Sequence, residues 1–111
     1  LPDDYFDVII DGCSLIHFNP TQNQYFNQGL YDSSVIINKK LKKDGIFVIS
    51  SDLAKPTDKE SNEWLHPNTF IEIVEAAQFK LLGDSNFSDT DDLFDVKGWL
   101  SIGTFAFTPV K

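Results

Sequence analysis

The sequence contains a single cysteine, few basic residues and no methionine, and it has no long hydrophobic run. Cys13 alone excludes an internal disulfide and fits a reducing compartment, so we expect a cytoplasmic protein. The apolar runs are only a few residues long, well below the ~20 that a membrane-spanning helix needs, and no signal-peptide pattern opens the chain. We therefore expect no membrane partner.

Basic residues are outnumbered, with 9 Lys and Arg against 17 Asp and Glu, which gives a formal net charge of -8. A nucleic-acid partner would require a basic stripe, and the one basic cluster consists of Lys39, Lys40, Lys42 and Lys43. These lysines lie at the end of a predicted helix, where cations complement the helix dipole; the alternative is a phosphate-binding patch. We expect no nucleic-acid partner.

Methionine is absent and the chain begins at Leu1. Because a natural reading frame begins with Met, we expect a processed product or a fragment of a longer chain. A length of 111 residues suffices for one domain with a real core, so residues 1–111 are predicted to form a single domain. A hydrophobic content of 41% and an aromatic content of 14% argue against disorder.

The stretch from Asp3 to Phe18 organises the rest of the chain. An apolar, β-branched run over Tyr5–Ile10 follows a turn signal and stops at Asp11-Gly12, which predicts a strand buried on both faces. Such strands belong to parallel sheets that helices cover on both sides. Ligands of open α/β sheets bind outside the carboxyl ends of strands, so the first candidates for a site are Asp11, Gly12, Cys13 and Ser14.

A helix and a second strand are predicted next. Residues 30–42 carry apolar side chains at helical spacing, and their terminal lysines suit a helix carboxyl terminus. Asp44-Gly45 is expected to end this helix with a left-handed backbone. Ile46–Ser51 is again apolar and β-branched, so the order strand, helix, strand predicts a right-handed parallel crossover.

The second half of the chain alternates between polar and apolar segments. Residues 52–67 are expected to form a loop that could lie over a site. Helical spacing over 68–78 predicts a second helix, in which Thr69 and Glu72 could form a capping box. Two further strands are predicted, over 79–82 and over the alternating segment 100–108, which suits an antiparallel strand or one nearer the sheet edge.

Four segments carry a resemblance to a known family. Phe6–Phe18 is similar to that family's fourth strand and the start of its next segment, and Leu41–Ile49 to the helix–turn–strand before its fifth strand. Phe70–Leu81 resembles the last helix and the turn into the sixth strand, and Thr104–Phe107 resembles the closing antiparallel strand. In this order, the chain resembles the carboxyl-terminal half of a class I S-adenosylmethionine-dependent methyltransferase.

The resemblance implies an α/β, Rossmann-like half domain with parallel strands, crossover helices and an antiparallel final strand. It implies S-adenosylmethionine as the cofactor and a small-molecule acceptor as the substrate. Family members bind the cofactor chiefly through a Gly-rich turn, whereas the six glycines here (12, 29, 45, 83, 98 and 103) form no Gly-x-Gly-x-Gly pattern. The chain looks like the substrate-side half, which we expect to be inactive without the missing amino-terminal half.

Three other positions depart from the family pattern. Lys43 and Asp44 stand where the family often has Pro and Gly, and Gln78 stands where Gly is usual. If the backbone of Gln78 is left-handed, this residue costs on the order of 1 kcal/mol. None of these changes touches the chemistry that the resemblance implies.

The resemblance places Asp11–Ser14 opposite the methionine part of the cofactor and the acceptor. Asp11 would then accept a hydrogen bond from an ammonium or a substrate amine, and His17 would help to remove a proton. The alternatives are a turn in which Asp11 bonds its own backbone, and a His17 side chain satisfied locally on a short helix. Cys13 is either a partly buried filler or a nucleophile, which would need an activating base such as His17.

Trp64 lies in the predicted loop over 52–67 and could act as a lid, although packing in the core or on the surface is the commoner fate of Trp. Residues 84–95 partly match a calcium loop, but Asp89 replaces the turn Gly and Asp95 replaces the bidentate Glu, which favours a solvated acidic loop. Two histidines and one cysteine make no zinc signature. We therefore expect no bound metal.

A second function remains open, in which the chain is a non-catalytic domain that works by protein association. One face or edge of its sheet must then be covered by a partner or by a second copy of the chain, in a homo-oligomer. Binding of S-adenosylhomocysteine would distinguish an active site from such a domain.

Overall fold

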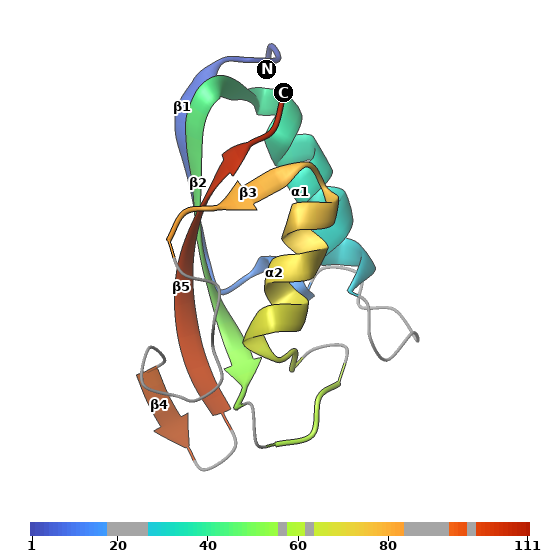
Figure 1. Ribbon diagram of the computed structural model, residues 1–111, viewed down its shortest axis with the longest axis vertical. Coiled ribbons are helices and arrows are strands. Elements are labelled where there is room, and N and C mark those ends of the chain that lie inside the picture. Colours follow the sequence, from blue (N-terminus) through green and yellow to red (C-terminus); the bar gives the residue numbers. More distant parts are fainter. Residues whose placement is uncertain (18–26, 56–57, 62–63, 84–93, 98–99) are drawn as a thin grey trace.

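The computed structural model describes residues 1–17, 27–55, 58–61, 64–83, 94–97 and 100–111. A 3-10 turn, η1, follows the first strand, and two α-helices separate the first three strands (Figure 1). The elements are β1 (Phe6–Gly12), η1 (Leu15–His17), α1 (Gln28–Lys40), β2 (Leu41–Ala54), α2 (Pro67–Ala76), β3 (Phe79–Leu81), β4 (Phe94–Lys97) and β5 (Leu100–Pro109).

The strands form one mixed sheet in the order β1-β2-β5-β3, and β4 pairs with β5 outside this path. β1 and β2 are parallel, and α1 is the helix that connects them. β5 is antiparallel to β2, β3 and β4, the three strands with which it pairs. The predicted α/β class, with a parallel pair, a crossover helix and an antiparallel final strand, is confirmed.

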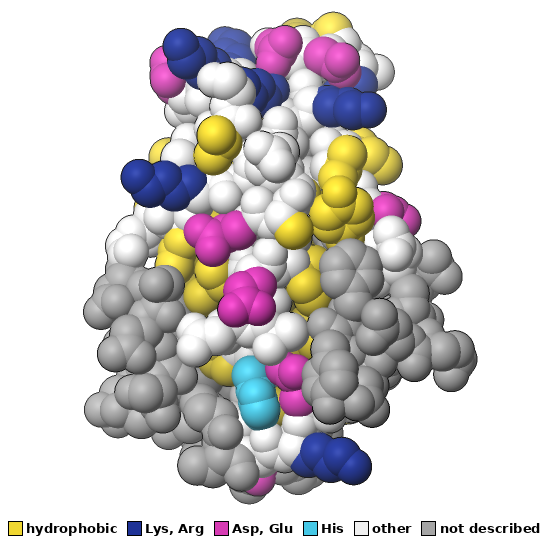
Figure 2. Space-filling view, turned by 45° about the vertical axis from the view of Figure 1, so that its right-hand side comes forward, with side chains coloured by type: hydrophobic (Ala, Val, Ile, Leu, Met, Phe, Trp, Pro, Cys, Tyr) yellow, Lys and Arg dark blue, Asp and Glu magenta, His cyan; other side chains and the backbone are white. Residues whose placement is uncertain are grey.

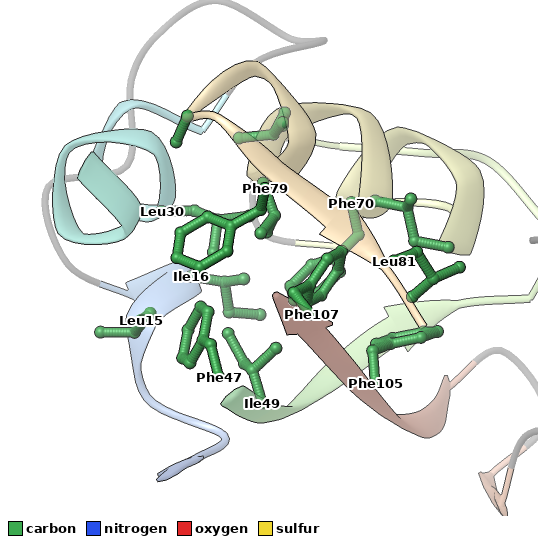
Figure 3. Packing of buried hydrophobic residues seen from close by; sticks show 14 of the residues in the cluster. Leu15, Ile16, Leu30, Phe47, Ile49, Phe70, Phe79, Leu81, Phe105 and Phe107 are labelled. Carbon is green, nitrogen blue, oxygen red and sulfur yellow. The ribbon is translucent and has the colours of Figure 1, made fainter. Parts of the chain in front are cut away.

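Both helices pack on the same face of the sheet (Figure 1). Phe47 and Ile49 of β2 and Phe105 and Phe107 of β5 alternate with polar or smaller residues and are all buried toward the helices. Figure 3 shows the Phe47, Phe79 and Phe107 side chains beneath the two helices, with Leu30 of α1 nearby. The hydrophobic core therefore lies on one side of the sheet.

The prediction that the first strand is buried on both faces is wrong. Val8 is 50% exposed and Ile10 is 73% exposed, although Ile9 packs against the core. The physical reason is that α1 and α2 lie on the same face of the sheet (Figure 1), and Ile9 packs against the core on that face, whereas Val8 and Ile10 are exposed. The strand also runs two residues further than predicted, so that Gly12 belongs to it.

Helix α1 begins and ends two residues earlier than the sequence predicted. Asn27 caps its first turn, because the Asn27 side chain accepts from the Leu30 N–H at 2.9 Å and donates to the Ile16 carbonyl at 2.6 Å. The predicted left-handed ending at Asp44-Gly45 is wrong, since these residues lie inside β2. Gly45 suits this crowded position, because a Cβ would lie 3.0 Å from the Lys42 carbonyl oxygen and 3.2 Å from the Asp7 carbonyl oxygen of β1.

Helix α2 begins at Pro67, and the predicted capping box of Thr69 and Glu72 is wrong. The cap residue is His66, which makes no side-chain capping bond. The His66 N–H instead donates to the Glu60 carboxylate at 2.7 Å, so a loop carboxylate lies before the positive end of the helix. Pro67 suits the first helical position, where no N–H partner is needed.

Two further segments differ from the sequence prediction. β2 continues to Ala54, so the predicted loop over 52–67 begins later, and β4 occupies a position predicted as an acidic connection. Most of the calcium-loop candidate over 84–95 lies outside the described residues. Within the described ranges, no helix combines the length and apolar character needed to cross a membrane.

Candidate functional site

The parallel pair β1 and β2 ends at one edge of the sheet, and a sharp turn follows β1 there. The Asp11 carboxylate organises this turn: it accepts from the N–H of Ser14 at 3.3 Å, from the N–H of Leu15 at 3.4 Å, and from the Ser14 hydroxyl. The carboxylate thereby orders the entry into η1. The sequence allowed two interpretations of Asp11, a residue that binds a ligand and a residue that stabilises a turn. The structure shows the hydrogen bonds of a turn residue.

Cys13 occupies the strained position of the turn, with a positive φ of 60°. Its N–H donates to the Ser50 carbonyl at 2.9 Å, which joins the turn to the end of β2. Partial burial raises the pKa of the Cys13 thiol, and the negative charges of Asp52 and then Asp11 raise it further. A raised pKa keeps the sulfur as a neutral thiol, which opposes a nucleophilic role.

His17 and Asp52 meet at the same edge of the sheet. The Nε2 atom of His17, at the end of η1, lies 3.6 Å from a carboxylate oxygen of Asp52, near the end of β2. The His17 side chain is 42% exposed and the Asp52 side chain is 24% exposed, so solvent and small molecules reach the pair. A carboxylate at this distance from an imidazole restricts the orientation of the ring.

Trp64 completes this cluster from the loop before α2. Its ring contacts the His17 ring edge to face, with centroids 6.3 Å apart and an interplanar angle of 75°. The structure thus brings together Asp11, Cys13, Ser14, His17 and Trp64, the residues singled out in the sequence. Gly12 lies beside them at the end of β1, and open space surrounds the position where its Cβ would be.

Asp52 is the member of the cluster that the sequence analysis did not select. It was placed in a polar loop because the second strand was predicted to stop at Ser51. A signal was nevertheless present, since Asp52 and Asp11 each follow an apolar strand of the predicted parallel pair. Polar residues at the carboxyl ends of adjacent parallel strands meet at one edge.

Two surface hollows of about 300 Å³ each lie elsewhere, on the helical side of the molecule. Figure 2 turns this side toward the viewer and shows acidic side chains between hydrophobic ones. One hollow is lined by Asn68, Ile71, Glu72 and Glu75, and the other by Tyr31, Val35, Asn38, Lys39, Ala76, Ala77 and Gln78. Neither hollow contains a residue of the cluster around His17.

The cluster presents the carboxylates of Asp11 and Asp52, the imidazole of His17 and the ring of Trp64 at one edge of the sheet. Among the described residues, no group of three or more His, Cys, Asp or Glu side chains is arranged to hold a metal ion.

No protein-family model matches the sequence, and a search of the curated proteins finds no similar sequence. The fold matches solved structures along nearly its whole length. The [4+2]-cyclase SpnF superposes with a TM-score of 0.71 at 13% identity, over 100% of this chain and 52% of that chain. The PH0226 protein from Pyrococcus horikoshii superposes with a TM-score of 0.57 at 14% identity, over 98% of this chain and 54% of that chain.

A TehB-like SAM-dependent methyltransferase from Corynebacterium glutamicum superposes with a TM-score of 0.51 at 19% identity, over 96% of this chain and 49% of that chain. The chain thus spans about half the length of the structures that it matches. Likeness at these identities concerns the fold. At that level, the chain stands with Rossmann-like α/β proteins that include an S-adenosylmethionine-dependent methyltransferase.

Proposed function

We propose that these 111 residues form the substrate-side, carboxyl-terminal portion of an S-adenosylmethionine-dependent methyltransferase that acts on a small-molecule acceptor. The observation that carries the proposal is the gathering of Asp11, His17, Asp52 and Trp64 at the carboxyl ends of two parallel strands. A structure described as a SAM-dependent methyltransferase has the same fold. Another with this fold is described as a [4+2]-cyclase, so the test must follow methyl transfer itself.

The described residues do not form a complete site for the cofactor. The Asp11 carboxylate is occupied within its own turn, and Gly12 is the one glycine of the cluster. The sequence contains no Gly-x-Gly-x-Gly turn, the kind of turn that lets the backbone approach a bound cofactor closely. The proposal therefore assigns most of the cofactor site to polypeptide outside these residues, and it assigns to this chain the orientation and deprotonation of the acceptor.

His17 is the residue proposed to take a proton from the acceptor. Because its Nε2 faces Asp52, its Nδ1 is the nitrogen that would receive the proton, and Asp52 would stabilise the imidazolium that forms. Trp64 packs its ring against His17 and restricts where an acceptor can lie. An acceptor with a hydroxyl or amine fits this arrangement, because such groups must lose a proton during methylation.

The decisive experiment uses the protein that the gene encodes, with the 111 residues in their natural context. Transfer of a labelled methyl group from S-adenosylmethionine is measured against a panel of small hydroxyl and amine acceptors. We expect His17→Gln to lower kcat by about 10²-fold or more, and Asp52→Asn to lower it less. A protein that neither transfers the methyl group nor binds S-adenosylhomocysteine would overturn the proposal.

The chain offers a matched control for the His17 variant. His66 also lies 3.6 Å from a carboxylate, that of Glu60, but this pair belongs to the loop before α2. We expect His66→Gln to leave kcat near its original value while His17→Gln lowers it, because only His17 is proposed to take the proton of the acceptor. Calorimetric titration of the isolated 111 residues with S-adenosylhomocysteine should be flat, and tight binding would contradict the assignment of the cofactor site to other polypeptide.

Association without catalysis is a second candidate function, and the exposure of Val8 and Ile10 favours it. In that case the exposed side chains of β1 are buried in the folded gene product, but calorimetric titration with S-adenosylhomocysteine gives no heat of binding. The two candidates therefore give opposite results in a single calorimetric experiment on the full gene product.

A further inference from the structure

The carboxylate of Asp52 has a different kind of partner from the aspartates at the opposite end of the molecule. At the end where both chain termini lie (Figure 1), three exposed aspartates each pair with a lysine ammonium at 2.6 to 3.2 Å, in the pairs Lys40–Asp3, Lys42–Asp7 and Lys111–Asp4. Asp52 lies near the other end of β2, is less exposed than these three, and pairs with His17. Within the described residues, no lysine forms an ion pair with Asp52.

A histidine cancels the charge of a carboxylate only when its imidazole is protonated. The proposed function requires a neutral His17, because the ring must take a proton from the acceptor. In that state Asp52 keeps its full negative charge in a partly buried position, where a carboxylate attracts a cation more strongly than it does in bulk water. Asp52 is therefore suited to bind a positively charged ligand.

Two further observations at this edge of the sheet favour a cation. Burial, then the charge of Asp52 and then that of Asp11 raise the pKa of the Cys13 thiol, so the negative charge that opposes a thiolate here also opposes other anions. The Trp64 ring packs on the same His17 ring that Asp52 contacts, and Trp is the side chain whose face attracts cations most strongly. A carboxylate close to an aromatic ring suits an ammonium group.

We propose that Asp52 and Trp64 select an ammonium group, so that the acceptor is a small amine that binds in its protonated, positively charged form. This inference rests on the proposed function and narrows its acceptors from hydroxyls and amines to amines. The ammonium nitrogen gives one proton to Nδ1 of His17, and its freed lone pair forms the N–CH3 bond as the S–CH3 bond of S-adenosylmethionine breaks. The product nitrogen then carries the positive charge, and His17 releases its proton to solvent.

Three probes of similar size test the preference for positive charge, because benzylamine, benzyl alcohol and benzoate are a cation, a neutral molecule and an anion at pH 7. Their binding to the full gene product is measured by calorimetric titration, which does not depend on methyl transfer. We expect benzylamine to bind about tenfold more tightly than benzyl alcohol, and benzoate not to bind. A higher salt concentration should weaken the binding of benzylamine and leave that of benzyl alcohol unchanged.

Two variants that change the net charge equally separate the site from the rest of the surface. Asp52→Asn should weaken the binding of benzylamine about tenfold and leave that of benzyl alcohol unchanged, and Asp52→Ser serves if the Asn variant does not fold. Glu72→Gln removes one negative charge from α2, in a hollow that contains no residue of the cluster around His17, and should leave the binding of both probes unchanged. Trp64→Leu should weaken the binding of benzylamine more than that of benzyl alcohol, whereas Trp64→Phe retains an aromatic face.

Three outcomes would overturn the selection of an ammonium group. One is that benzylamine binds no more tightly than benzyl alcohol, another is an equal loss in Asp52→Asn and Glu72→Gln, and the third is that none of the three probes binds. Binding of benzylamine without methyl transfer to any acceptor would keep the ammonium site and remove the proposed function. Methyl transfer to hydroxyl acceptors alone, without a preference for benzylamine, would keep the proposed function and remove the ammonium site.

Discussion

Cys13 illustrates how the turn after β1 controls the chemistry of a single side chain. Burial raises the pKa of its thiol above the usual value of 9.0, and the charges of Asp52 and Asp11 act in the same direction. A raised pKa in the folded state means that folding favours the neutral thiol. This contribution to stability is complete below the unfolded pKa and is lost as the pH rises through the folded pKa.

Alkylation of Cys13 by iodoacetamide tests this account, because the thiolate is the reacting species. We measure the pH at which the alkylation rate reaches half of its maximum, and we expect this midpoint to be higher in the folded protein than in urea. Asp52→Asn should move the midpoint downward, since it removes the larger of the two charge effects. Asp32→Asn on the exposed face of α1 is the control and should leave it in place. If Asp52→Asn leaves the midpoint unchanged, the charge of Asp52 does not raise the pKa of the Cys13 thiol.

The candidate site shows what residue patterns can and cannot predict. Asp11 and His17 were selected because they follow a predicted strand, and Trp64 because it lies in a predicted loop that could cover the site. The structure places the Trp64 ring against His17, and His17 on the turn that Asp11 organises. Asp52 was missed because the extent of β2 depends on its pairing with Ile102 of β5. That pairing joins residues far apart in the sequence, and no local pattern contains it.

At the scale of elements, the junction between α2 and β3 carries a measurable strain. Gln78 joins the two elements with a positive φ of 67°, the conformation that its place in the family pattern suggested. Its carbonyl accepts from the Val110 N–H at 2.8 Å and from the Asn38 side chain at 2.7 Å. These bonds hold the residue in a backbone conformation that costs an L-residue about 1 kcal/mol.

Gln78→Gly should therefore stabilise the protein by about 1 kcal/mol, partly offset by the greater freedom of Gly in the unfolded chain. Urea denaturation followed by circular dichroism measures the difference. Gln78→Ala removes the same exposed side chain but retains a Cβ, so its stability should stay near that of the parent. If the two variants are equally stable, the strain at this junction has been overestimated.

Element types were predictable because each depends on a local period of apolar residues, whereas element ends were not. α1 ends at Lys40 because β2 begins at Leu41 without an intervening turn. The start of α1 depends on Asn27, whose side chain also bonds η1, an element eleven residues earlier. β4 was missed because its four residues are too few to show a period within an acidic segment.

For the whole molecule, the sequence predicted a two-sided sheet and the structure has a one-sided core. The apolar pattern of β1 predicts burial of the strand, but it does not identify the polypeptide that covers each face. α1 and α2 supply one layer, under which Phe47, Phe79 and Phe107 pack with ring centroids 5.4 to 6.3 Å apart. The isolated chain should therefore draw its stability from that layer alone.

This asymmetry predicts very different costs for truncations on the two faces of the sheet. Phe107→Ala removes a fully buried ring between β2 and β3, and we expect a loss of about 3–5 kcal/mol in the free energy of unfolding. Val8→Ala truncates a half-exposed side chain of β1 and should cost less than about 1 kcal/mol in the isolated chain. Urea denaturation at two protein concentrations measures both. A cost for Val8→Ala that approaches the Phe107→Ala value, or that grows with protein concentration, would mean that the Val8 side chain is already packed in solution.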